Sequence, residues 1–214
     1  MWDPWDLTDP RHAVTYTHPG LFDFCDVSQN NWQVGQLHYE RLIWYRSNLL
    51  VHGGPRPMNN VKIYGRARGE ECDAFRNADR FWKCIFAGCA SARFHRPPSG
   101  LGLNKVAQTH VRAARTFTDA FDLFAAEPHN DLLTDRADDE AYCLGRPGRF
   151  YAVYFPRPGS VTLKLKPAGA TWHVRWFELS RATFGRPRKA NGGPLVLKTP
   201  GRKRFQFVLI EKAD

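Results

Sequence analysis

The sequence has no apolar run as long as the roughly 18 residues that a membrane-spanning helix requires. Residues 1–9 contain three aspartates and no apolar stretch of the kind that a secretory signal peptide carries. The five cysteines form no C-x-x-C pair, and Cys84 and Cys89 have no histidine partners at a zinc-binding spacing. We therefore expect no membrane partner, no metal site, no disulfide framework and no cofactor.

Acidic residues are in the minority. Lysine and arginine number 31 against 21 aspartates and glutamates, which leaves a formal net charge of +10. A basic balance can indicate a polyanionic partner. However, the densest runs, 186–189 and 202–204, stand in turn-like segments between predicted strands, where solvated charges are ordinary. No nucleic-acid-binding motif accompanies them, so the sequence does not favour a nucleic acid partner.

The first part of the chain alternates between apolar runs of strand length and longer segments of helical periodicity. Strands are predicted at 21–27, 60–64 and 90–95, and helices at about 34–50, 73–87 and 104–126. A helix between each pair of strands is typical of β/α units and predicts a parallel sheet.

The pattern changes after Pro128. Short strands separated by glycine and proline turns are predicted at 151–155, 161–165, 171–177, 195–197 and 205–210. Such spacing is typical of an antiparallel β-sandwich. We therefore predict one domain over residues 1–130 and a second over 138–214, with the boundary near 127–140.

Several segments carry a family resemblance. In the second part, residues 142–144, 151–156, 159–163 and 174–177 resemble the collagen-binding domain proposed for the C-terminus of apiosidase-like glycoside hydrolases, and 205–210 matches its closing strand. The resemblance covers about residues 138–212. In the first part, residues 22–31, 56–65 and 90–97 are similar to the last three β/α units of the same hydrolases.

The resemblance implies α/β plus all-β architecture: a partial (β/α)₈ TIM barrel followed by an antiparallel β-sandwich. A complete barrel needs about 250 residues, so we expect the earlier strands to lie outside this chain, which would be a fragment or a truncated relative of a glycoside hydrolase. Unpaired strand edges would then favour association with the missing barrel half or with a second copy. The implied partner is a poly- or oligosaccharide, and members of the family are typically exported.

The resemblance also bears on catalysis, which in these hydrolases requires two carboxylates. The acid/base of such barrels usually follows the fourth strand, which is absent, and Lys62 stands where the nucleophilic glutamate is expected. Asp26, at the end of the first predicted strand, is the remaining catalytic candidate, although it can equally bind substrate or pair with an arginine. We therefore expect this chain alone to be inactive.

The other candidate residues follow the predicted strands, because barrel sites gather at the carboxyl ends of strands. The substrate-binding candidates are Gln29, Asn30, Asn31, Lys62, Tyr64, His95 and Arg96. The three amides suit sugar hydroxyls or a turn that caps the next helix. Tyr64 can stack on a sugar or pack in the core, and His95 can bind substrate or a backbone carbonyl. Arg96 can hold a carboxylate.

Three functions therefore stay open. The first is a glycoside hydrolase segment that acts on glycosidic bonds only when completed. The second is a carbohydrate- or collagen-binding accessory module. The third is a basic protein that binds polyanions through the segments around Arg186 and Arg202.

Overall fold

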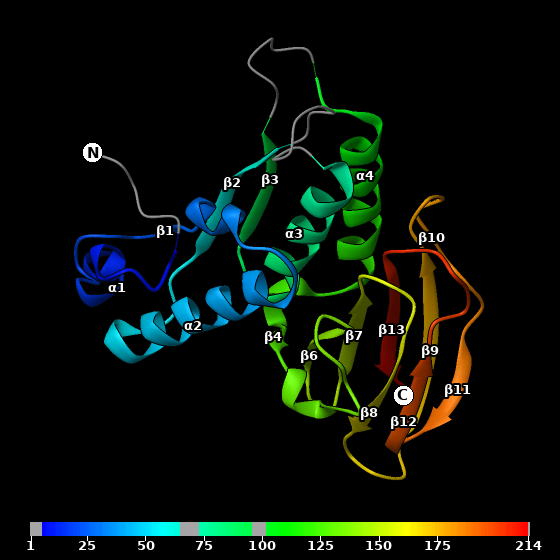
Figure 1. Ribbon diagram of the computed structural model, residues 1–214. Coiled ribbons are helices and arrows are strands. Elements are labelled where there is room, and N and C mark those ends of the chain that lie inside the picture. Colours follow the sequence, from blue (N-terminus) through cyan, green and yellow to red (C-terminus); the bar gives the residue numbers. More distant parts are fainter. Residues whose placement is uncertain (1–5, 65–72, 96–101, 214) are drawn as a thin grey trace. The chain divides into compact units, whose positions relative to one another are not determined.

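The computed structural model describes residues 6–64, 73–95 and 102–213. The chain divides into two compact units, Met1–Gln108 and Thr109–Asp214. The first carries a parallel sheet with helices, and the second carries antiparallel sheets (Figure 1). This arrangement agrees with the order of α/β and all-β parts that the sequence predicts.

The first unit is built on three parallel strands in the order β1-β2-β3. The strands are β1 (Cys25–Asp26), β2 (Met58–Tyr64) and β3 (Ser91–His95). The helices are η1 (Pro10–His12), α1 (Ala13–Thr17), η2 (Ser28–Trp32), α2 (Gly35–Gly53) and α3 (Ala74–Phe86). Thus α2 joins β1 to β2 and α3 joins β2 to β3, as expected of β/α units.

Local chemistry explains where α3 begins and which face it buries. The Asp73 carboxylate accepts hydrogen bonds from the backbone N–H groups of Phe75 (2.8 Å) and Arg76 (3.2 Å), which is an N-cap. Further along, Phe81 stacks on Phe94 of β3 with ring centroids 4.8 Å apart. Trp82 is fully buried, whereas Phe75, which the periodicity places on the same face, is 51% exposed.

The first strand is much shorter than the predicted 21–27: it begins only at Cys25, and a side chain ends it after Asp26. Asp26 Oδ1 accepts hydrogen bonds from the backbone N–H (2.9 Å) and the hydroxyl of Ser28, which turns the chain into η2. The Ser28 hydroxyl in turn accepts a hydrogen bond from the backbone N–H of Val61 at 2.9 Å. If β1 continued, a backbone carbonyl of that strand would accept this hydrogen bond instead. Apolar character alone therefore overestimates this strand.

The second unit contains two antiparallel sheets. The larger has the order β10-β9-β13-β7-β6-β4, with β11 also paired to β9, and the smaller has the order β12-β8-β5. The larger sheet comprises β4 (Glu127–Pro128), β6 (Tyr142–Arg146), β7 (Phe150–Phe155), β9 (Thr171–Glu178), β10 (Thr183–Phe184), β11 (Arg188–Asn191) and β13 (Gln206–Lys212). The smaller comprises β5 (Leu133–Thr134), β8 (Ser160–Leu165) and β12 (Gly193–Lys198). Two short 3-10 helices accompany these strands: η4 (Leu123–Ala125) precedes β4, and η5 (Asn130–Leu132) lies between β4 and β5.

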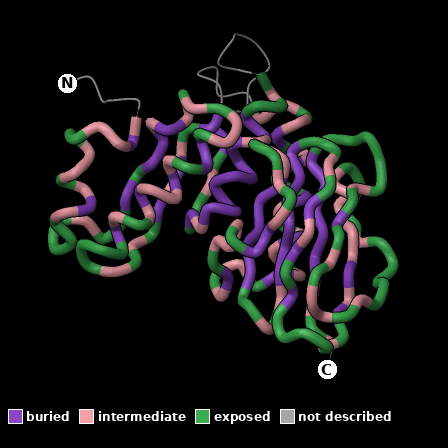
Figure 2. The backbone as a smooth tube through the Cα atoms, turned by 60° about the horizontal axis from the view of Figure 1, so that its bottom comes forward, coloured by how far each residue is buried: buried purple, intermediate pink, exposed green. Residues whose placement is uncertain are grey.

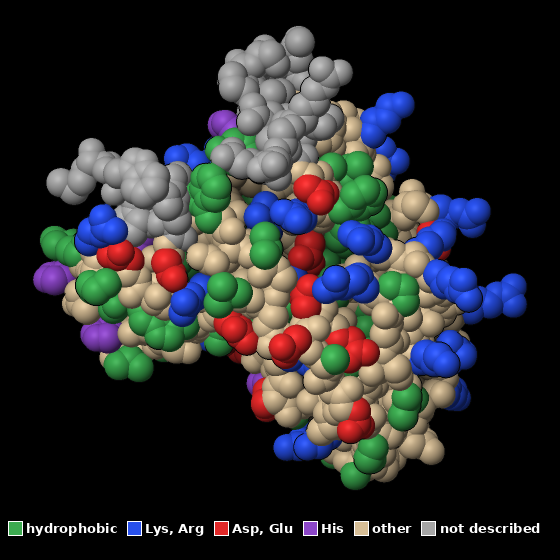
Figure 3. All heavy atoms as spheres, in the orientation of Figure 1, with side chains coloured by type: hydrophobic (Ala, Val, Ile, Leu, Met, Phe, Trp, Pro, Cys, Tyr) green, Lys and Arg blue, Asp and Glu red, His purple; other side chains and the backbone are tan. Residues whose placement is uncertain are grey.

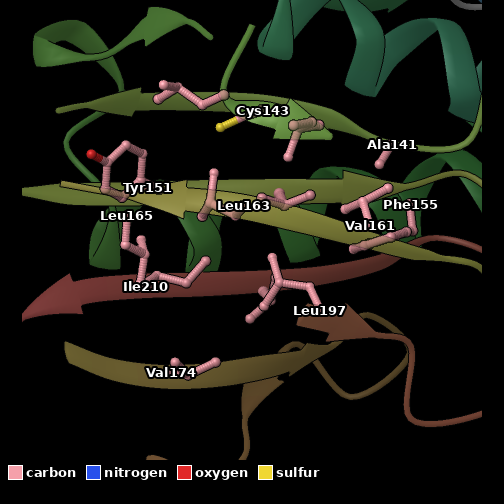
Figure 4. Packing of buried hydrophobic residues seen from close by; sticks show 14 of the residues in the cluster. Ala141, Cys143, Tyr151, Phe155, Val161, Leu163, Leu165, Val174, Leu197 and Ile210 are labelled. Atoms are coloured by element: carbon pink, nitrogen blue, oxygen red, sulfur yellow. The ribbon is translucent and has the colours of Figure 1, made fainter. Parts of the chain in front are cut away.

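The core of this unit lies between the two sheets. Cys143 and Ile210 from the larger sheet pack with Leu163 and Leu197 from the smaller one, and all four are at most 3% exposed (Figure 4). The alternate residues of the larger sheet are buried as well, so its central strands are covered on both faces (Figure 2). Tyr154, for example, stacks on Phe207 at 4.9 Å.

The helix α4 (Lys105–Ala120) covers the second face of the larger sheet. Phe117 lies 6.0 Å from Phe177 and 5.9 Å from Phe207 between ring centroids, and Phe121 lies 5.2 Å from Phe150. This packing explains why most of α4 groups with the strands and why the division falls after Gln108 rather than at the sequence boundary of 127–140. The predicted helix also extends too far, because the chain leaves α4 at Ala120.

One basic run was wrongly predicted to be a turn. Arg188 and Lys189 begin the strand β11, which pairs with β9 so that Arg188 faces Val174 and Lys189 faces His173. The sequence of this strand lacks the apolar alternation by which a strand is recognised, because its charged side chains are exposed at the edge of the sheet. The run 202–204, in contrast, lies in an exposed turn, as predicted.

Candidate functional site

The parallel sheet brings two of the predicted residues together. Tyr64 ends β2 and His95 ends β3, and the two residues are register partners. Their rings meet edge to face with centroids 6.0 Å apart, and both side chains are partly exposed. Because parallel strands end at one edge of a sheet, both rings lie at the carboxyl edge of β2 and β3.

These two rings lie on the face of the sheet that the helices do not cover. Phe94 packs on α3, so its neighbours Arg93 and His95 point the other way. On β2, Asn60 Nδ2 donates to Cys84 Sγ of α3 at 3.3 Å, and Ile63 is fully buried. These two buried residues are three positions apart, rather than two, because the pairing register shifts between Asn60 and Ile63. Lys62, within the shifted segment, is exposed.

Asp26 does not join this pair. In the sheet, Asp26 is level with Asn59 of β2, and Asn59 is level with Ser91 of β3. His95 follows Ser91 by four residues, which places it about 13 Å further along the strand direction at ~3.3 Å per residue. In addition, Asp26 Oδ1 is engaged by Ser28 in the turn described above.

The amide candidates divide between the interior and the surface. Asn30 is fully buried, and its Nδ2 donates to the backbone carbonyl of His38 at 2.8 Å, so it ties η2 to α2. Asn31 and Asn60 exchange hydrogen bonds of 3.0 and 2.7 Å between their side-chain amides. Gln29 is partly exposed in η2. The structure therefore gives Asn30 and Asn31 defined packing roles.

A buried polar network adjoins these amides, and no sequence pattern indicated it. Cys84 Sγ lies 3.6 Å from His38 Nε2 and also accepts from Asn60. Burial opposes ionisation of this thiol, but hydrogen bonds from Cys89, His38 and Asn60 outweigh it and lower the pKa of Cys84 to about 5. Because Cys84 and His38 are both 0% exposed, the pair has no access to a substrate. Only the folded structure joins these residues, which are far apart in the sequence.

The described groups at the carboxyl edge can contact a polar ligand. Within the described residues, Lys62, Tyr64, Arg93 and His95 supply cationic, aromatic and hydrogen-bonding groups, and the open face of β2 and β3 carries no carboxylate. Arg96 lies outside the described residues. The part of the chain that the structure describes also shows no cluster of metal-ligating side chains, and none of its helices combines the length and apolar character needed to cross a membrane.

No protein-family model matches the chain, and no curated protein matches it. Solved structures do match. A family 5 glycoside hydrolase from Bacteroides vulgatus superposes with a TM-score of 0.66 at 12% identity, over 93% of this chain and 53% of the other. A further glycoside hydrolase gives 0.63 at 10% identity, over 82% and 46%. A family 30 endoxylanase from Clostridium papyrosolvens gives 0.54 at 7%, over 100% and 55%.

These matches concern the fold. The parallel α/β part followed by antiparallel sheets resembles parts of glycoside hydrolase structures over most of this chain. The chain spans about half the length of the structures that it matches. The resemblance to glycoside hydrolases is therefore established at the level of structure.

Proposed function

We propose that this chain is a carbohydrate-binding part of a glycoside-hydrolase-like fold, that Tyr64 and His95 contact the sugar, and that the chain alone does not cleave glycosidic bonds. The observation that carries the proposal is the pairing of these two rings at the carboxyl edge of the parallel sheet. Barrel enzymes build their ligand sites at this edge, and the solved structures with a similar fold are glycoside hydrolases.

The chemistry of the pair is suited to a sugar ring. A tyrosine offers an apolar face and a hydroxyl that can donate and accept, and an imidazole does the same with its two nitrogens. Lys62, exposed on β2, adds a cationic hydrogen-bond donor. Two partly exposed rings and one lysine offer a small contact area, so we expect the site to bind weakly unless further residues complete it.

The proposal of no hydrolysis is supported by the lack of a pair of acids among the described residues of this face. Glycosidases hold two carboxyl groups roughly 5–9.5 Å apart across the scissile bond. Among the described residues, the open face of β2 and β3 offers no carboxylate to pair with Asp26, and Oδ1 of Asp26 is engaged by Ser28 in a turn.

We further propose a specific family for the fold. Residues 1–130 correspond to the last three β/α units of an apiosidase-like hydrolase, and residues 138–214 form its accessory sandwich. The remaining barrel strands, or a second copy, would then complete the sugar site.

Binding can be tested by calorimetry of the full chain with neutral pectin-derived oligosaccharides. We expect Tyr64→Ala and His95→Ala each to weaken binding at least fivefold. The matched control is His52→Ala, because His52 is exposed and lies near the end of α2, the helix that precedes the amino end of β2. Equal affinity in all variants would contradict the assignment of the pair.

Hydrolysis is tested separately, by release of reducing ends from pectic substrates. We expect no turnover by the chain alone and no change in Asp26→Ala. Robust turnover that Asp26→Ala abolishes would show that Asp26 is the nucleophile and would refute the proposal.

A further inference from the structure

A second candidate site lies in the antiparallel unit, where the edges of its two sheets meet. Among the residues that the structure describes, β11 pairs only with β9 and β12 only with β8, so each has one edge without a strand partner there. Residues of β9, β11 and β12 line a groove of about 310 Å³. Trp176 and Leu195 contribute its apolar surface.

The charge on this groove is of one sign. Arg188 and Lys189 of β11 and Lys198 of β12 line it, and all three side chains are exposed. Within the described part of the chain, none of the three forms an ion pair, and no carboxylate lines the groove. Figure 3 shows lysine and arginine side chains gathered along the side of the molecule on which β10 and β11 lie. Arg188 is level with Val174 and shares the face of β9 that carries Trp176, whereas Lys189 and Lys198, each next to a residue of the inner face, point outward at the rims of the groove. Together these cations attract an anion to the groove.

The indole of Trp176 is held in place beneath these charges. Its ring lies 5.9 Å from that of Phe155, and it packs against the buried core between the two sheets. Trp176 also lines a second hollow of about 460 Å³, together with Arg202, Lys203 and Arg204. Of these, Lys203 is paired with Glu178 at 2.8 Å. Trp176 therefore borders two hollows that carry cations, and the second of these also contains Glu178.

We propose that this groove binds an acidic oligosaccharide. A uronate carboxylate or a sugar sulfate binds Arg188, whose planar guanidinium can donate two parallel hydrogen bonds, and the sugar ring lies against Trp176. Lys189 and Lys198 add positive potential from the rims of the groove. The neighbouring hollow accommodates the next sugar residues, and Arg202 supplies a further cation there.

Edge protection and nucleic acid binding are two rival roles for the groove, and each accounts for fewer of its features. Lysine and proline on an edge strand discourage pairing with another chain, and β12 carries both Pro194 and Lys198. Such protection requires neither a guanidinium on the inner face of β11 nor a fixed indole beside it. Single-stranded nucleic acid binds through successive stacking rings along an extended basic channel, whereas this groove is short and has one indole.

The proposal is tested by calorimetry of the full chain with four probes of similar length: a tetragalacturonate, a heparin-derived tetrasaccharide, a neutral tetrasaccharide and a DNA tetranucleotide. We expect the double variant Arg188→Ser/Lys198→Ser to lose at least tenfold in affinity for the two acidic sugars and to keep its affinity for the neutral one. Comparison of the carboxylated and sulfated sugars identifies the preferred anion.

Two further variants distinguish a specific site from general charge. Arg112→Ser removes the same charge from the exposed side of α4 and should change affinity less than twofold. Trp176→Phe preserves the packed ring but reduces its area, and should weaken binding of the acidic sugars about threefold. The proposal is overturned if the double variant binds them normally, if DNA binds as tightly as they do, or if neither acidic sugar binds. Because this site is separate from Tyr64 and His95, its failure leaves the proposed function untouched.

Discussion

His110 makes the stability of the antiparallel unit depend on pH. The imidazole lies on α4, is 3% exposed, and meets the ring of Phe205 edge to face at 4.7 Å. Burial lowers the pKa of His110 from 6.5 to about 4. A charged imidazole is therefore costly in this environment, and the folded state holds the ring neutral.

The direction and size of the effect follow from the two pKa values. Because the folded pKa lies below the unfolded one, the contribution is fully present above pH 6.5 and is lost as the pH falls towards 4, where the unfolded chain binds the proton first. Each unit of difference between the unfolded and folded pKa corresponds to about 1.4 kcal/mol, so the free energy of unfolding falls by about 3 kcal/mol over this window.

Urea unfolding at pH 7.0, 5.5 and 4.5, followed by near-ultraviolet circular dichroism, measures this loss. Carboxylates titrate in the same range, so the informative quantity is the difference from His110→Gln, which should lose less stability over the window. The control is His173→Gln, at a partly exposed position in β9. If wild type and His110→Gln lose stability in parallel, the burial of His110 does not determine the pH dependence.

Three further changes test the packing described above. Asp73→Ala should cost about 1 kcal/mol in urea unfolding, because it removes the N-cap of α3; Asp73→Asn, which keeps an acceptor, should cost less. Gly145→Ala should destabilise β6 strongly, since the new Cβ would lie 2.7 Å from the backbone oxygen of Phe150; normal thermal stability would contradict this geometry. Asn60→Ala should cost about 1–3 kcal/mol, because it leaves the partly buried amide of Asn31 unpaired; an unchanged urea midpoint would show that water replaces the pair.

The helices and most strands were predictable because their signals are local. Asn104 was predicted to begin α4, and its side chain accepts the N–H of Ala107 at 2.8 Å. The alternation in 151–155 and 161–165 likewise corresponds to β7 and β8. The end of α4 was placed too late because Phe124 continues the apolar pattern, yet that side chain is 83% exposed.

The candidate site was predictable only in part. Tyr64 and His95 could be proposed because both follow predicted strands, and parallel strands end at one edge. Their separation from Asp26 could not be predicted, because it depends on the register of β1 against β2. Register arises from contacts between strands that are distant in sequence, and a sequence pattern does not carry it.

The amino-acid sequence by itself determined the alternation of helix and strand, the change to antiparallel strands, the basic charge and the residues that follow each strand. Periodicity, capping side chains and turn residues act over a few positions, so they can be recognised in one segment at a time. Only the tertiary structure decided that Asn30 is buried, that Cys84 meets His38, and that Trp176 lies between cations from two sheets. These features depend on which segments pack together, and burial, pairing and local charge are defined only after they have done so.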